Sequence, residues 1–184
     1  MLMLLFRVGD EPWAIAVSKI REIVPLVALQ KMPHSLSEQA SVVSGLMTYR
    51  GGSLPVVDVS ALMSDRASTQ TLNTRIAVVE SAAKTTDDKQ PQSTRLPAGL
   101  ILDQVSGTAP LEPVANIPTV SPYVQANWRV ASEAEVIRQL AIDPIIVQVH
   151  QKPLESEFNM TPNRSSNTSL EAVAMTNGFS QIGA

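Results

Sequence analysis

Three aspartates stand where a carboxylate could do acid–base chemistry. Asp58, Asp103 and Asp143 each end an apolar segment of the chain. The end of a buried strand can present a catalytic acid, but it is also where a carboxylate caps the turn that follows. Capping is the commoner role, and an enzyme would need at least two of these groups to converge in one cleft. We therefore interpret the three aspartates as caps.

The other residue types that do chemistry are scarce. The chain has no cysteine, which excludes disulfides, thiolate zinc sites and cysteine nucleophiles. Its two histidines, His34 and His150, are far apart in loop-like surroundings and are predicted to be exposed loop residues. Phosphate-binding glycine loops and nucleophile motifs are missing from the sequence. The sequence thus predicts no catalytic residue, no cofactor and no metal site, and the protein is not expected to be an enzyme.

The stretch from 45 to 59 reads as two apolar strands joined by a tight turn. Gly51 and Gly52 can take positive φ at little steric cost. Arg50 stands at the edge of this turn and cannot lose its charge. Two interpretations remain open. Either Arg50 simply extends from a core hairpin to water, or a partner carboxylate holds it and it shapes a surface that another protein recognises.

Short strands and turns position this hairpin. Period-two alternation and apolar runs predict strands over 2–8, 13–17, 20–29, 45–59, 75–80, 100–111 and 135–142. Short helices are expected as one turn in the segment from 17, ahead of the strand that continues to 29, in the residues leading to 43, at 60–63 and from 143 onward. Loops are expected over 81–95 and 112–127. Beyond residue 152 Ser, Thr and Asn dominate, so residues 1–152 are predicted to be the folded domain and 153–184 a disordered tail.

Composition limits the class of protein. A chain of 184 residues with 44% hydrophobic and 4% aromatic residues can fold as one domain, or as two small subdomains sharing an aliphatic core. The net charge of −3 and the few aromatics argue against a nucleic-acid partner. The apolar start, residues 1–6, is too short for a signal peptide or a membrane span. We therefore expect a cytoplasmic protein without direct membrane insertion.

Four segments together resemble one protein family. They are Phe6–Val17, Lys19–Val24, Gly45–Val59 and Leu96–Val105. The third is similar to a signature in which Gly-x-x-Asn-x-Arg-Gly precedes Pro-Val-x-Asp and an aliphatic residue, with Thr48 standing in the place of the usual Asn. The chain resembles the CheW-like family, the coupling proteins of bacterial chemotaxis-type signalling, over roughly residues 2–150.

This resemblance implies a fold and a function. The fold would be all-β, with two small, intertwined, five-stranded SH3-like β-barrel subdomains sharing a hydrophobic core, and a few short helices. The function would be that of a non-catalytic adaptor in two-component signalling. It would couple the cytoplasmic tip of methyl-accepting chemoreceptors to the regulatory domain of a CheA-type histidine kinase, at membrane-associated receptor arrays. The alternative is a small β-barrel module that binds protein or nucleic acid and is unrelated to chemotaxis.

The resemblance also implies a binding site. It matches Glu22 and Arg50 to a charged pair near the receptor-facing surface, and we expect the two to form a partly buried ion pair. An apolar groove between the subdomains would accept one face of a coiled-coil tip. The apolar residues expected near that groove, for each of which core packing is an equal alternative, are Ile20, Val24, Val42 and Val43.

Overall fold

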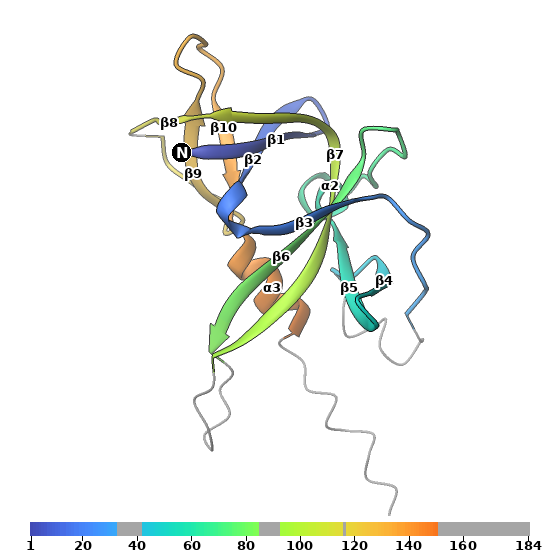
Figure 1. Cartoon of the computed structure of the whole chain (residues 1–184). Helices are drawn as coiled ribbons and strands as arrows, with labels where there is room; N and C mark the ends of the chain where they lie inside the picture. Colours follow the sequence, from blue (N-terminus) through green and yellow to red (C-terminus); the bar gives the residue numbers. More distant parts are fainter. Residues whose placement is uncertain (33–41, 85–92, 116, 151–184) are drawn as a thin grey trace, which may run out of the picture. The chain divides into compact units, whose positions relative to one another are not determined.

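The structure is a computed structural model that describes residues 1–32, 42–84, 93–115 and 117–150 (Figure 1). Its strands are β1 (Leu2–Val8), β2 (Glu11–Ala16), β3 (Ile20–Pro25), β4 (Gly45–Tyr49), β5 (Gly52–Asp58), β6 (Arg75–Lys84), β7 (Ser93–Pro110), β8 (Glu112–Pro113), β9 (Val124–Arg129) and β10 (Ile137–Leu140). Its helices are the 3-10 turn η1 (Val17–Lys19), α2 (Val59–Ser64) and α3 (Ile142–His150). No helix among these residues is both long and apolar enough to span a membrane.

Five strands form a first barrel, which we call barrel I. Its strands pair in the order β3, β6, β7, β5, β4, with only the first part of β7 taking part. The segment that follows β3 closes the ring at an isolated bridge. There the Gln30 amide donates to the Leu46 carbonyl at 2.8 Å, and the Leu46 amide returns a bond of 2.9 Å. Barrel I carries the hairpin singled out in the sequence.

The remaining strands form barrel II. They pair in the order β7, β1, β2, β10, β9, β8, and β8 continues β7 after a single residue, Leu111. β8 pairs with β9, which closes this ring as well. Between Leu111 and Met1 two further backbone bonds of 2.9 Å tie the chain start to the β7–β8 junction.

The long strand β7 belongs to both barrels (Figure 1). It pairs with β6 as far as Leu102 and with β1 from Asp103 onward. At the junction its register against β1 shifts, and Gln104 and Gly107 both take positive φ. Such bulges bend a strand and increase its twist. This bulge lets one strand leave barrel I and enter barrel II.

Three clusters of buried side chains make up the core. One fills barrel I, and a second fills barrel II. The third and largest combines residues of both barrels with α3. Alternation along the strands explains this division, because Val56 packs inside barrel I while its neighbour Val57 packs in the shared cluster. Strands buried on both faces read as continuous apolar runs, as these do.

The predicted all-β class, with two small barrels, a shared core and few helices, is confirmed. Some predicted boundaries are wrong. β3 ends at Pro25 instead of continuing to 29, strands occupy 81–84 and 93–95, β8 lies within the predicted loop 112–127, and β9 begins inside it. The prolines there are compatible with strands because they stand at their ends or between them. The predicted tail, 153–184, and most of the helix predicted ahead of 43 lie outside the described residues.

Candidate functional site

Three side chains from two strands and a turn meet at the edge of barrel I. Glu22 comes from β3, Tyr49 ends β4, and Arg50 is the first residue of the β4–β5 turn. The Tyr49 hydroxyl donates to Glu22 Oε2 at 2.6 Å, and Arg50 Nη2 donates to the same oxygen at 3.1 Å. The guanidinium of Arg50 also lies 5.2 Å from the centre of the Tyr49 ring. We refer to these three residues as the rim triad.

The turn that carries Arg50 differs in detail from the sequence prediction. The two residues between the strands are Arg50 and Gly51, and both take positive φ, at +50° and +82°. Gly52, which was also expected to take positive φ, is instead the first residue of β5. Positive φ at both central positions is the geometry of two-residue hairpins, but it is sterically costly for a residue with a Cβ. The fold therefore holds Arg50 in a backbone conformation that aims its side chain back along the turn toward β3.

Hydrogen bonding within the rim triad shifts the pKa values of all three side chains. The Tyr49 hydroxyl, and next the Arg50 guanidinium, stabilise the Glu22 carboxylate and hold its pKa below the ordinary value of 4.5. The same bond raises the pKa of Tyr49 above 10.0, because the phenol must stay protonated to donate to Glu22. The carboxylate likewise raises the pKa of Arg50. At neutral pH the triad thus carries one anion, one cation and one neutral hydroxyl in fixed positions.

The predicted Glu22–Arg50 ion pair is present, and the expected partial burial holds for Glu22, which is half-buried, but is wrong for Arg50, which is exposed. The Arg50 side chain is 60% exposed and that of Glu22 41%. Exposed ion pairs contribute little to folding stability, because water solvates and screens both charges. The main effect of this pair is therefore to hold an accessible carboxylate and an accessible guanidinium in a fixed orientation.

The four apolar residues predicted at the site lie in different surroundings. Ile20 packs at the cluster shared by the two barrels, whereas Val24 packs against the interior of barrel I. Alternating burial places both on the half-buried face of β3 together with Glu22. Val42 and Val43 are half-buried in the residues that lead into β4, and neither belongs to the three described clusters. The structure thus brings Ile20, Glu22 and Val24 to one strand face, next to Arg50.

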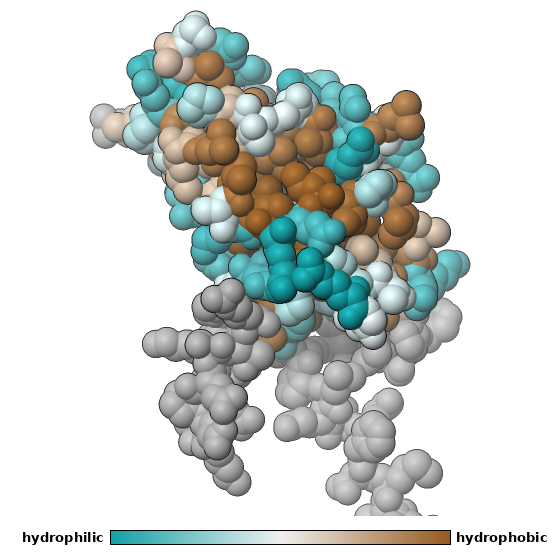
Figure 2. Space-filling view, in the orientation of Figure 1, coloured by the Kyte–Doolittle hydropathy of each residue, from teal (hydrophilic) through white to brown (hydrophobic). Residues whose placement is uncertain are grey.

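Sequence reasoning missed two features of this edge. Tyr49 was read only as part of an apolar strand, although a phenol next to a conformationally fixed arginine is a candidate hydrogen-bond donor. Ile23 and Val27, which lie on or just after β3, expose 43% and 45% of their surface. β3 crosses the face seen in Figure 1, and in the same view hydrophobic side chains gather across the middle, with hydrophilic residues below them (Figure 2). The period-two alternation along 20–25 was the sequence pattern that could have predicted exposed apolar side chains on this strand.

Of the three aspartates, Asp58 takes the predicted capping role, whereas Asp103 lies within β7 and Asp143 lies in the first turn of α3. Asp58 caps α2 by accepting from the amides of Ser60 and Ala61, and it also accepts from Ser68. Asp103 accepts from the hydroxyl of Ser60 at 3.3 Å, so these two buried carboxylates do lie near each other.

Donors from backbone amides and hydroxyls occupy both oxygens of each of these two carboxylates. Asp143 lies elsewhere, exposed, where it accepts from the hydroxyl of Ser81 at 2.5 Å. The hydrogen bonds to Asp58 and Asp103 brace the segment between α2 and β6.

His150 is not an exposed loop residue as predicted, since it ends α3, half-buried, with its Nε2 3.1 Å from the Pro97 carbonyl. His34 lies outside the described residues. Among the residues that the structure describes, no group of three or more histidine or carboxylate side chains is arranged to hold a metal ion.

Comparison with known proteins decides the family. The model of the CheW-like domain matches residues 2–150. The chain belongs to the CheW-like domain family. A similar curated protein is the chemotaxis protein CheW of Rhizobium meliloti (strain 1021), 29% identical over 104 residues, which are 56% of this chain and 57% of that protein. The chain thus aligns with little more than half the length of this CheW relative.

A solved structure supports the same fold. The crystal structure of the scaffolding protein TtCheW from Thermoanaerobacter tengcongensis superposes with a TM-score of 0.61 at 20% identity. The match covers 83% of this chain and 91% of that one. Both CheW-like barrels lie within the residues that the family model matches.

Proposed function

We propose that this protein is a non-catalytic adaptor in chemotaxis-type signal transduction. It couples the cytoplasmic tip of a methyl-accepting chemoreceptor to the regulatory domain of a CheA-type histidine kinase. In this proposal it works in the cytoplasm, where binding to receptors recruits it to membrane-associated arrays. Membership of the CheW-like family supports the proposal, and favours it over a β-barrel module unrelated to chemotaxis.

The observation that carries the proposal is the rim triad. It presents an ionised carboxylate and a guanidinium at an exposed edge, both held in place by Tyr49. Charges fixed before binding lose little conformational freedom when a partner docks, and they favour complementary partners over others. An exposed pair that adds little stability but is braced on two sides is suited to recognition.

The neighbouring apolar residues suggest what binds there. Ile23 and Val27 are exposed on or near the strand that carries Glu22, and Ile20 and Val24 are half-buried beside it. Amphipathic helices bind such surfaces by laying aliphatic side chains into shallow apolar pockets, with charges at the margin. We propose that the receptor helix contacts this region of barrel I, with Val42 and Val43 at its border and Glu22 and Arg50 at its charged margin.

The test is binding of the full chain to two purified partners. Binding to a receptor cytoplasmic fragment and to a CheA-type regulatory domain is measured by calorimetry in solution, or by pull-down with each partner immobilised. The proposal expects binding to both, and a large loss of receptor binding in Arg50→Glu. The reciprocal pair Glu22→Arg with Arg50→Glu should recover part of the receptor binding, because it restores the salt bridge with reversed polarity.

The matched control is Arg138→Glu. Arg138 forms a comparably exposed pair with Glu11, but on barrel II, with side-chain exposures of 43% and 55%. Its reversal should leave receptor binding unchanged. Binding of the wild-type chain to neither partner would contradict the adaptor function. Equal effects of the two reversals would contradict the assignment of the receptor surface.

A further inference from the structure

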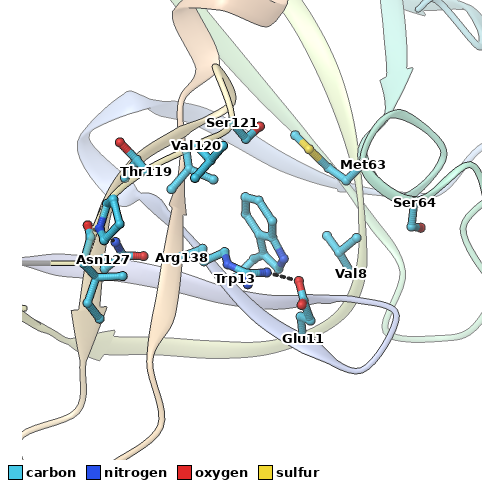
Figure 3. Close-up of a pocket in the computed structure, with 13 residues that line it drawn as sticks. Val8, Glu11, Trp13, Met63, Ser64, Thr119, Val120, Ser121, Asn127 and Arg138 are labelled. Atoms are coloured by element: carbon cyan, nitrogen blue, oxygen red, sulfur yellow. Dashed lines mark hydrogen bonds and ion pairs between the residues drawn. The ribbon is translucent and has the colours of Figure 1, made fainter.

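A pocket lies on barrel II, and the proposed adaptor function does not use it. It has a volume of about 590 Å³ and opens between β2, α2, β9, β10 and the residues 117–121 (Figure 3). Pockets of several hundred Å³ with mainly apolar walls and a few polar groups are the usual form of small-molecule sites. The side chains that carry the argument are Val8, Glu11, Trp13, Met63, Val120 and Arg138.

Trp13, one of the lining residues, carries an unused hydrogen-bond donor at the wall of this pocket, where neighbouring atoms cover the nitrogen. The residue is only 4% exposed, and its indole Nε1 is buried without a hydrogen-bond partner among the described residues. Trp128, the other tryptophan of the chain, donates from the same atom to Gln139 Oε1 at 2.6 Å. A buried donor left unpaired lowers stability, and a buried tryptophan nitrogen usually finds an acceptor. An acceptor supplied by a ligand would remove that cost.

The charges at the pocket restrict the ligand to an uncharged one. Glu11 and Arg138 are the only ionisable side chains among the lining residues, and they bind each other. The Arg138 guanidinium lies 5.8 Å from the centre of the Trp13 ring. Figure 3 shows the ring nitrogen on the side of Val8 and Glu11. Since Glu11 and Arg138 are both exposed, they can move and let an acceptor reach the nitrogen.

The remaining walls are uncharged: the neutral polar side chains Ser64, Thr119, Ser121 and Asn127 stand among apolar ones that favour an apolar body. Val8 and Met63 line one side, and Val120 stands at the pocket with 93% of its surface exposed. An apolar molecule seated there would remove this valine from water, which is favourable at roughly 25 cal/mol per Å² of buried apolar surface. Walls drawn from several separate elements suit a compact body better than an extended segment.

We propose that this pocket binds a small, uncharged, mainly apolar organic molecule whose carbonyl-type oxygen accepts a hydrogen bond from Trp13 Nε1. The inference is independent of receptor and kinase binding. It assigns barrel II a ligand site in addition to the adaptor surface of barrel I. The probe we choose is acetophenone, which joins an apolar ring to one carbonyl acceptor. Ethylbenzene is its matched control, since it has the same carbon skeleton without the acceptor.

The test follows the two indole N–H signals of the ¹⁵N-labelled full chain by NMR. Acetophenone should shift the Trp13 signal in a saturable manner and leave the Trp128 signal in place, and ethylbenzene should shift Trp13 less. A Trp13 signal unmoved by acetophenone, or equal shifts of both tryptophans, would overturn the proposal. So would a Glu11→Ala variant whose ligand-free Trp13 signal moves as far as acetophenone moves it, because Glu11 would then be the acceptor.

A variant pair gives the binding constants. Trp13→Phe keeps an aromatic wall but removes the donor, and should weaken acetophenone binding roughly fivefold to tenfold, the effect of one lost hydrogen bond. Trp128→Phe, the matched control, should bind as the wild type does. Equal affinities for wild type and Trp13→Phe would overturn the assignment of the donor. If Trp13→Phe does not fold, the titration of the unaltered chain decides the question alone.

Discussion

The hydroxyl of Tyr49 donates a 2.6 Å hydrogen bond to the carboxylate of Glu22, across 27 residues of sequence. This bond is shorter than the one that Arg50 makes to the same oxygen, and it is the main reason why the pKa of Glu22 lies below its ordinary value. Tyr49 therefore positions the Glu22 carboxylate through its hydroxyl and the Arg50 guanidinium through its ring.

Replacement of Tyr49 by Phe should raise the pKa of Glu22 toward 4.5, because the phenol no longer stabilises the carboxylate. Arg50→Gln should raise it as well, because the hydrogen bond and the charge of the arginine also stabilise the carboxylate. Carboxyl NMR titration measures both shifts. The control is Tyr123→Phe, which removes a hydroxyl bonded to Gln148 and should leave Glu22 unchanged.

The sign of the linked stability follows from the direction of that shift. A carboxyl whose pKa is lower in the folded state than in the unfolded state stabilises the fold at pH values above 4.5. This contribution disappears as the pH falls through the folded-state pKa. The stability difference between wild type and Tyr49→Phe should therefore shrink in acid, and a difference that grows there would contradict the assignment.

Glu22 and Arg50 should show a measurable but small coupling in unfolding by urea. The variants Glu22→Gln, Arg50→Gln and the double replacement form a thermodynamic cycle that isolates the pair. Since both groups are exposed, the coupling should weaken further when salt is added. Strictly additive effects of the two single replacements would show that the ion pair does not persist in solution.

Removal of the Asp58 carboxylate should destabilise the protein by about 2 kcal/mol, the combined effect of a lost helix cap and of donors left without an acceptor. Asp58 is buried and accepts from α2 and from Ser68. Asp58→Ala therefore loosens the segment between α2 and β6. The matched control is Asp65→Asn, at the exposed other end of the helix, where asparagine tolerates the positive φ. Equal losses for both variants in thermal unfolding would refute the capping role.

A methyl group at Gly45 should open barrel I at its closing bridge. A Cβ there would lie 2.8 Å from the Gln30 carbonyl oxygen and 2.8 Å from Leu29 Cβ. Gly45→Ala should cost about 1–3 kcal/mol, the usual range for overpacking. Gly52→Ala is the control, since its nearest neighbour would be 3.7 Å away. Amide exchange at Leu46 should accelerate in Gly45→Ala alone, and an unchanged rate would place the closure elsewhere.

The sequence predicted the parts of the fold that depend on local pattern. The apolar runs through Val56 and Val57 indicate strands buried on both faces, and the structure distributes these two neighbours between two core clusters. The turn was predicted one residue late, because glycine preference alone favoured Gly51 and Gly52 over the observed Arg50 and Gly51. Backbone geometry fixed by strand pairing overrode that preference.

The candidate site was less accessible to prediction. The Glu22–Arg50 pair was expected from a family resemblance, whereas the bond from Tyr49 depends on how β3 and β4 come together when barrel I closes. The exposure of the pair could not be predicted either, because burial is set by segments distant in sequence. The unpaired nitrogen of Trp13 has no sequence signal at all, since it results from the combined shape of β2, α2 and β10.

The course of β7 has a consequence for how the two surfaces are inherited. Barrel II begins with β1 and β2, the chain then builds most of barrel I, and β7 supplies a strand to both before barrel II is completed. No single cut in the backbone releases either barrel whole, so gene fusion or truncation cannot transfer one without the other. The rim triad of barrel I and the pocket on barrel II are therefore inherited together, whatever each of them binds.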